Sequence, residues 1–67
     1  MTYLLNGNQI DLTETITIFD VVKKICGSAL EGIAVAKNGA VVRRDDWTSV
    51  QIEAGDEVEI LRASCGG

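Results

Sequence analysis

The chain ends in two glycines, and the group there that is able to do chemistry is the α-carboxylate of Gly67. Gly66 and Gly67 have no side chains that could pack on a protein body, and glycine has the largest backbone freedom of any residue. Residues 63–67, Ala-Ser-Cys-Gly-Gly, reach roughly 17 Å when extended, at about 3.3–3.6 Å per residue. Such a tail is able to carry a free carboxylate into a narrow channel of another protein. The alternative is a frayed end without chemistry.

A carboxylate needs activation before it can react as an acyl group. An α-carboxyl has a pKa of about 3.3–3.7, so at neutral pH it is an anion that resists nucleophiles. Adenylation by ATP would convert it into a mixed anhydride, whose carbonyl a persulfide or thiolate of a partner attacks with loss of AMP. The chain contains neither Gly-x-Gly-x-x-Gly nor Gly-x-x-x-x-Gly-Lys-Ser/Thr. We therefore expect this chain to bind no cofactor and ATP to belong to a partner.

Few other side chains could take part in catalysis. The chain has no histidine, which excludes Ser-His-Asp and Cys-His catalysis and removes the commonest metal ligand. Cys26 and Cys65 match no zinc or Cys-x-x-Cys pattern, so we expect reduced thiols and no metal site. Cys65 lies beside the reactive end. Its thiol is expected to attack the activated carbonyl, to form mixed disulfides or to store sulfur. The alternative is that Cys65 is only an exposed spacer. Cys26 is expected in the core.

The charge balance indicates the kind of partner. Six basic against ten acidic residues give a net charge of -4. This argues against nucleic acid, whose affinity depends on Lys and Arg neutralising phosphates, and favours a protein with a basic docking face. The predicted partner contacts are Glu57, Glu59, Leu61, Arg62, Ser64, Cys65 and Gly66, with Asp45 and Asp46 as further acids. The alternative is that Leu61 is a scattered surface residue and the acids only solvate the chain.

The length and the first residues limit the setting in which the chain works. Sixty-seven residues make one small domain, near the size where a single core is only just sufficient. No apolar run approaches the roughly 20 residues of a membrane span. Residues 1–6 lack the basic region and long apolar segment of a signal peptide. We therefore expect no membrane partner and a cytoplasmic location.

Turn residues divide most of the chain into short strands. Asn6-Gly7 and Asn38-Gly39 are hairpin signals, because both turn residues adopt positive φ angles. In the last strand the alternation predicts that Val58 and Ile60 point inward. The expected strands are residues 3–5, 9–13, 33–37, 40–42, a short strand or bridge at 49–52, and 57–60.

One amphipathic helix is expected after the first hairpin. Thr17 and Asp20 have the spacing of a capping box, and Gly27 is a plausible C-terminal stop. The residues expected on its apolar face are Ile18, Val21, Val22 and Ile25, with Phe19 and Cys26 widening it. Later in the chain, residues 43–47 are expected to form a single helical turn whose Trp47 packs down as an anchor.

The order of elements is hairpin, helix, hairpin, short turn and final strand. If sequential strands are neighbours, the first and last strands lie parallel in the middle with the helix across one face. This is the β-grasp (ubiquitin-like) arrangement of the α+β class, with a mixed sheet of four to five strands. We expect a β-grasp domain at residues 1–62 and a flexible reactive tail at residues 63–67.

Motifs along nearly the whole chain resemble those of ubiquitin-like sulfur carriers, and most closely the ThiS family of thiamine biosynthesis. The segments that carry the resemblance are Asn6-Gly7, the helix at 18–25, residues 35–39, the Arg-x-x-Trp turn within residues 42–47, residues 53–60 with Gly-Asp-x-Val-x-Ile, and the terminal diglycine. Two positions depart from the family pattern. Many members have a proline where this chain has Arg43, and an apolar residue or glycine is usual where Cys65 stands.

The resemblance implies a carrier that is a co-substrate and not an enzyme. A ThiF-like, E1-type partner would adenylate Gly67, and sulfur would come indirectly from a cysteine desulfurase or sulfurtransferase. The Gly67 thiocarboxylate would then donate sulfur to thiazole formation on a ThiG-like synthase.

Three other functions remain open at this point. The same fold and tail would suit the small subunit of molybdopterin synthase or a carrier for another sulfur metabolite. A ubiquitin-like modifier would be conjugated to lysines through Gly67. A non-reactive β-grasp interaction module would not need a free C-terminus.

Overall fold

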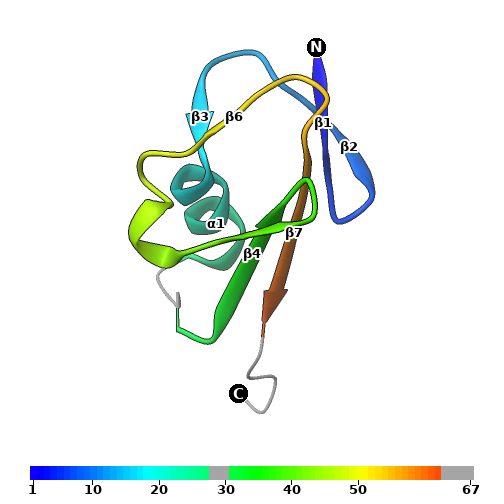
Figure 1. Cartoon of the computed structure of the whole chain (residues 1–67). Helices are drawn as coiled ribbons and strands as arrows, with labels where there is room; N and C mark the ends of the chain where they lie inside the picture. The colour runs from blue at the N-terminus through cyan, green and yellow to red at the C-terminus, as the bar shows by residue number, and fades with distance from the viewer. Residues whose placement is uncertain (28–30, 63–67) are drawn as a thin grey trace.

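The computed structural model describes residues 1–27 and 31–62 of the chain. Within them, five strands form one sheet in the order β2-β1-β7-β4-β5, and helix α1 covers one face of it (Figure 1). Strands β3 and β6 pair separately. The elements are β1 Thr2–Leu5, β2 Asn8–Asp11, β3 Ile16–Thr17, α1 Ile18–Cys26, β4 Ile33–Lys37, β5 Ala40–Val42, the 3-10 helix η1 Arg44–Asp46, β6 Gln51–Ile52 and β7 Glu57–Arg62.

The first and last strands are parallel neighbours, as predicted. Leu4 lies opposite Glu57 and Leu5 opposite Val58. The other neighbouring pairs of this sheet are antiparallel, which makes it mixed and places β7 in the middle. The predicted β-grasp fold is therefore confirmed. The boundary between a domain at 1–62 and a tail at 63–67 stays a prediction, because the tail lies outside the described residues.

Both Asn-Gly pairs form the tight turns that the sequence predicts. Asn6 and Gly7 have φ angles of 50° and 85°, and Asn38 and Gly39 have 53° and 85°. Two successive positive φ angles match the right-handed twist of the strands that the turn joins. Asparagine tolerates this left-handed region better than most residues, and glycine enters it without a steric cost.

Helix α1 begins and ends where the sequence predicts. Thr17 Oγ1 accepts a hydrogen bond from the Asp20 N–H (3.2 Å), and Asp20 Oδ2 accepts one from the Thr17 N–H (2.9 Å). This reciprocal capping box satisfies two donors that the helix itself leaves unpaired. Gly27 stops the helix with φ 67°, and its N–H donates to the Lys23 carbonyl (2.8 Å).

The predicted apolar face of the helix is wrong at one residue, Ile25. Ile18, Val21 and Val22 are buried, but Ile25 is 50% exposed. The last helical turn packs through Cys26, which contacts the core cluster. Because neighbouring helix residues point about 100° apart, the turn that packs through Cys26 leaves Ile25 outside.

The segment after β5 closes the open end between sheet and helix. Trp47 is 2% exposed, and its indole N–H donates to the Val42 carbonyl (3.0 Å). The predicted helical turn and its tryptophan anchor are thus confirmed. Ile52 of β6 lies opposite Ile16 of β3, a strand that the sequence analysis did not predict. Among the described residues, the buried core consists of Tyr3, Ile18, Val21, Val22, Val35, Trp47, Ile52 and Val58.

Candidate functional site

Strand β7, which leads toward the C-terminus, has one covered and one open face. Val58 is 1% exposed, and Ile60 packs partly buried against the core. The alternate residues Glu57, Glu59 and Leu61 are exposed on the opposite side of the strand. Leu61 is 65% exposed, on the side of the strand away from the helix. Its contact with a partner stays a prediction.

Small and apolar residues of two neighbouring strands adjoin Leu61 on this open face. Ala34 lies directly opposite Leu61, and Ala36 lies between Glu59 on one side and Val41 on the other. Val41 is 77% exposed. We define Ala34, Ala36, Val41 and Leu61 as the open-face patch. Apolar side chains gathered on an uncovered sheet face are typical of a surface that binds another protein.

The sequence analysis missed three of the four patch residues, although the sequence carries a signal for two of them. In residues 33–37 the small Ala34 and Ala36 alternate with the larger Ile33 and Val35. Because side chains of a strand alternate between its faces, the two alanines must share a face opposite to the larger pair. A strand with large residues inward and alanines outward leaves a flat surface beside its neighbour.

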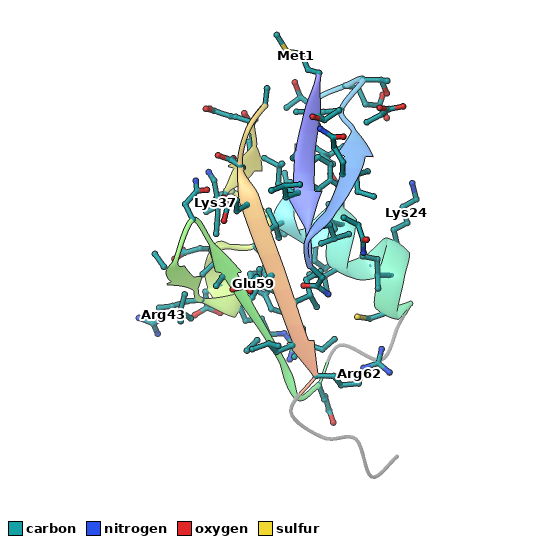
Figure 2. The ribbon with its side chains drawn as sticks, turned by 90° about the vertical axis from the view of Figure 1, so that its right-hand side faces the viewer. Met1, Lys24, Lys37, Arg43, Glu59 and Arg62 are labelled. Atoms are coloured by element: carbon teal, nitrogen blue, oxygen red, sulfur yellow. The ribbon has the colours of Figure 1, made fainter. Side chains whose placement is uncertain are left out.

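The acidic residues that the sequence analysis named lie on two different layers of the molecule, and their contacts with a partner stay predictions. Glu57 and Glu59 lie beside the open-face patch on β7, where Figure 2 labels Glu59. Asp45 and Asp46 lie in η1 on the helix side of the sheet (Figure 1). The residue after them, Trp47, accepts a backbone hydrogen bond from the first turn of α1 (2.9 Å). Only the two glutamates therefore adjoin the open-face patch.

Arg62 ends β7 on the other side of the strand from Leu61. It lies opposite Ile33 in the register and has the same parity as the inward Ile60, so the two predicted contacts Leu61 and Arg62 face opposite ways. Figure 2 shows Arg62 at the end of the strand that leads into residues 63–67. The remaining predicted site residues lie outside the described residues, and their roles stay predictions: Ser64, Cys65, Gly66 and Gly67.

Asp56 fixes the start of β7. Its Oδ1 accepts a hydrogen bond from Asn38 Nδ2 (3.0 Å), its Oδ2 accepts one from the Glu53 N–H (2.7 Å), and Lys37 Nζ lies 3.4 Å from Oδ2. Burial acts to raise the pKa of Asp56, but these hydrogen bonds and the Lys37 charge together lower it below its usual value. A lowered carboxyl pKa stabilises the fold above the unfolded-state value of about 3.9, and this contribution is lost as the pH falls through the folded-state value.

The described part of the chain offers little other chemistry. Cys26 is a free thiol, partly buried against the core cluster, which confirms its prediction as a core residue. Among residues 1–27 and 31–62, no three Cys, Asp or Glu side chains are grouped to hold a metal ion. The only α-helix in those ranges, α1, is too short to cross a membrane.

Comparisons with known proteins agree with this architecture. The crystal structure of the thiamine biosynthesis protein ThiS from Geobacter metallireducens matches with a TM-score of 0.81 and 25% identity, over 100% of both chains. The solution structure of a thiamine biosynthesis protein from the same organism matches with a TM-score of 0.80 and 26% identity, over 100% of this chain and 88% of that one. A search of curated proteins finds no significant match. The model of the ThiS family matches residues 3–67, nearly the whole sequence, and the chain therefore belongs to the ThiS family.

Proposed function

We propose that this chain is a sulfur carrier of thiamine biosynthesis whose Gly67 is adenylated and then converted to a thiocarboxylate. The observation that carries the proposal is the family match, which extends through residue 67 and so includes the diglycine. The position of β7 supports it. This strand is the middle one of the sheet, is paired on both sides and ends at Arg62, five residues before Gly67.

The proposed chemistry has three steps. The Gly67 carboxylate attacks the α-phosphorus of ATP, which forms an acyl-adenylate and releases pyrophosphate. A persulfide sulfur on a partner then attacks the carbonyl carbon, AMP leaves, and an acyl-disulfide joins the two proteins. A second thiol attacks the partner's sulfur in that bond, which releases Gly67 as a thiocarboxylate and leaves a disulfide between the two thiol sulfurs.

In this scheme the chain supplies the carboxylate and a docking surface, and it acts as a co-substrate rather than an enzyme. Its sequence contains no phosphate-binding motif, so ATP belongs to a ThiF-like, E1-type adenylating enzyme. The sulfur comes indirectly from a cysteine desulfurase or sulfurtransferase. A ThiG-like thiazole synthase then accepts the sulfur from the thiocarboxylate.

Intact-mass spectrometry tests the proposal directly. The chain is incubated with ATP, a sulfur source and a ThiF-like enzyme that has been shown to modify its own carrier. We expect a mass gain of about 16 Da, since one sulfur replaces one oxygen at the C-terminus. The reaction without ATP is the control and should leave the mass unchanged. A gain that does not need ATP, or no gain with the active enzyme, would contradict the proposal.

The docking surface in this proposal is the open-face patch with its two glutamates. Leu61 and Val41 offer exposed apolar area, and the alanines of β4 leave the surface between them flat. Glu57 and Glu59 add negative charge at the strand that leads to the tail. A partner that fits this surface has an apolar centre with basic residues beside it, because complementary charges speed association and fix orientation.

Charge reversal tests this surface. We expect Glu57→Lys with Glu59→Lys to slow association with the adenylating enzyme about tenfold at low salt, and the difference to shrink as salt is added. The matched control is Asp45→Lys with Asp46→Lys, which changes the net charge equally but lies on the helix side of the sheet. Stopped-flow association rates of both variants give the comparison. Equal slowing in both would mean that only the net charge matters, and no slowing in either would remove the electrostatic role.

A further inference from the structure

The strand β1 stops short of the end of its parallel neighbour β7. The last residue of β1, Leu5, lies opposite Val58, and the next residue, Asn6, donates its backbone N–H to the Val58 carbonyl (2.9 Å). The chain then turns away into the first hairpin through Asn6 and Gly7. The backbone of β1 therefore provides no partner for Ile60, the next residue of β7 with its polar groups on this side.

The side chain of Asn6 takes the place of the missing backbone. Its Oδ1 accepts a hydrogen bond from the Ile60 N–H (2.8 Å), and its Nδ2 donates one to the Ile60 carbonyl (3.3 Å). A carboxamide carries the same donor and acceptor as a peptide group, so this pair extends the parallel ladder by one unit. We define these two hydrogen bonds as the Asn6 clasp.

The clasp holds β7 near its C-terminal end, at Ile60. On the opposite side, β4 pairs with β7 up to Ile33 and Arg62. With the clasp, this end of β7 is therefore bonded to a neighbour on both sides; without it, the end of β7 is held by β4 alone. Ile60 lies seven residues before Gly67 and two before Arg62, so a shift of the strand there moves the end of β7.

We infer that Asn6 is a positioning residue for the transfer chemistry at Gly67. By holding Ile60 it fixes the end of β7, next to the exposed Leu61 of the open-face patch, from which the chain continues toward Gly67. This inference rests on the proposed function. A docked carrier in which the end of β7 is displaced places its carboxylate in the partner's channel less often, and errors of about 1 Å at a reacting group lower rates steeply.

The second Asn-Gly turn provides a matched control. Asn38 has nearly the same backbone angles as Asn6 and also bonds β7 through its side chain. Its Oδ1 accepts from the Glu57 N–H (2.9 Å), and its Nδ2 donates to Asp56 (3.0 Å). These bonds lie at the start of β7, whereas the Asn6 clasp lies near its end. Loss of either side chain should therefore weaken the hold on β7, but at opposite ends.

The experiment compares Asn6→Gly with Asn38→Gly. Glycine keeps the positive φ angle of each turn, and both variants gain the same backbone freedom, so the comparison between them isolates the two side-chain amides. We expect hydrogen exchange to rise about tenfold at the Ile60 amide in Asn6→Gly and at the Glu57 amide in Asn38→Gly. In adenylation by an active ThiF-like enzyme, kcat of Asn6→Gly should fall about tenfold with KM within about twofold, because docking is retained and positioning is not. Asn38→Gly should keep both constants within about twofold of the parent chain.

A third variant and the stability of all variants complete the test. Asn6→Asp keeps an oxygen for the Ile60 N–H but places another oxygen opposite the Ile60 carbonyl, so its kcat should lie between those of the parent and Asn6→Gly. Denaturant unfolding shows that each variant is folded under assay conditions. If the parent is adenylated and Asn6→Gly behaves like Asn38→Gly, the role of Asn6 is overturned while the proposed function stands. If the parent itself is not a substrate, the proposed function fails and the role of Asn6 fails with it.

Discussion

Adding one alanine after Gly67 is expected to abolish thiocarboxylate formation and to leave the fold unchanged. The extra residue moves the terminal carboxylate by about 3.5 Å and places a methyl group where the parent chain has none. A misplacement of this size at the reacting atom should lower the rate at least about 100-fold. Intact-mass measurement under the conditions that modify the parent chain gives the yield, and circular dichroism checks that the body is still folded.

The matched control adds one alanine directly after Met1 instead. Met1 is 89% exposed and lies at the far end of the sheet from the end of β7, so this variant should react like the parent (Figure 1). Continued sulfur incorporation in the C-terminally extended chain would contradict the role of Gly67. The same variant distinguishes the open alternatives, because a non-reactive interaction module would bind its partner equally well with the extension. A protein modifier would instead lose a ladder of conjugates in cells.

The elements with local signals were predictable from the sequence. Asn-Gly turns depend on the φ preferences of two adjacent residues, and both turns adopt positive angles as expected. The capping box at Thr17 needs only residues three positions apart, and both of its hydrogen bonds are present. Such features are decided within a few residues. They therefore do not depend on what packs against them from elsewhere in the chain.

The errors occur where distant segments meet. Ile25 has the spacing of a core residue, but its burial depends on what covers the last helical turn, and Cys26 fills that contact instead. The two residues of β3 form a strand only because β6 lies opposite them in the fold. Spacing along one segment does not contain either fact, since tertiary contacts override local patterns.

The candidate site also has one part that the sequence predicts and one part that depends on the fold. The chemistry of the tail follows from residue types alone, because a terminal diglycine has a carboxylate and no side chain. The open-face patch instead depends on the register that brings Ala34 opposite Leu61, which a one-residue slip would change. The Asn6 clasp joins residues 54 positions apart, so no local pattern indicates it.

Replacing Trp47 by alanine is expected to unfold most of the protein. The side chain is 2% exposed in the core between sheet and helix, and its N–H satisfies the Val42 carbonyl at 3.0 Å. Loss of a buried tryptophan costs about 3–5 kcal/mol. A domain of 67 residues has few kcal/mol to lose, because such a small chain buries a limited share of its surface. Far-UV circular dichroism in a denaturant titration measures the loss, since this substitution removes the only tryptophan of the chain.

Two further variants separate the causes of this loss. Trp47→Phe keeps most of the aromatic volume but removes the hydrogen bond to Val42, so it should cost about 1–2 kcal/mol. Val41→Ala truncates an apolar side chain of β5 that is 77% exposed, and it should change the free energy of unfolding by less than about 0.5 kcal/mol. A Trp47→Ala protein as stable as Val41→Ala would contradict the role of Trp47 as core anchor. If Trp47→Phe loses as much as Trp47→Ala, the hydrogen bond rather than the ring holds η1 against the sheet.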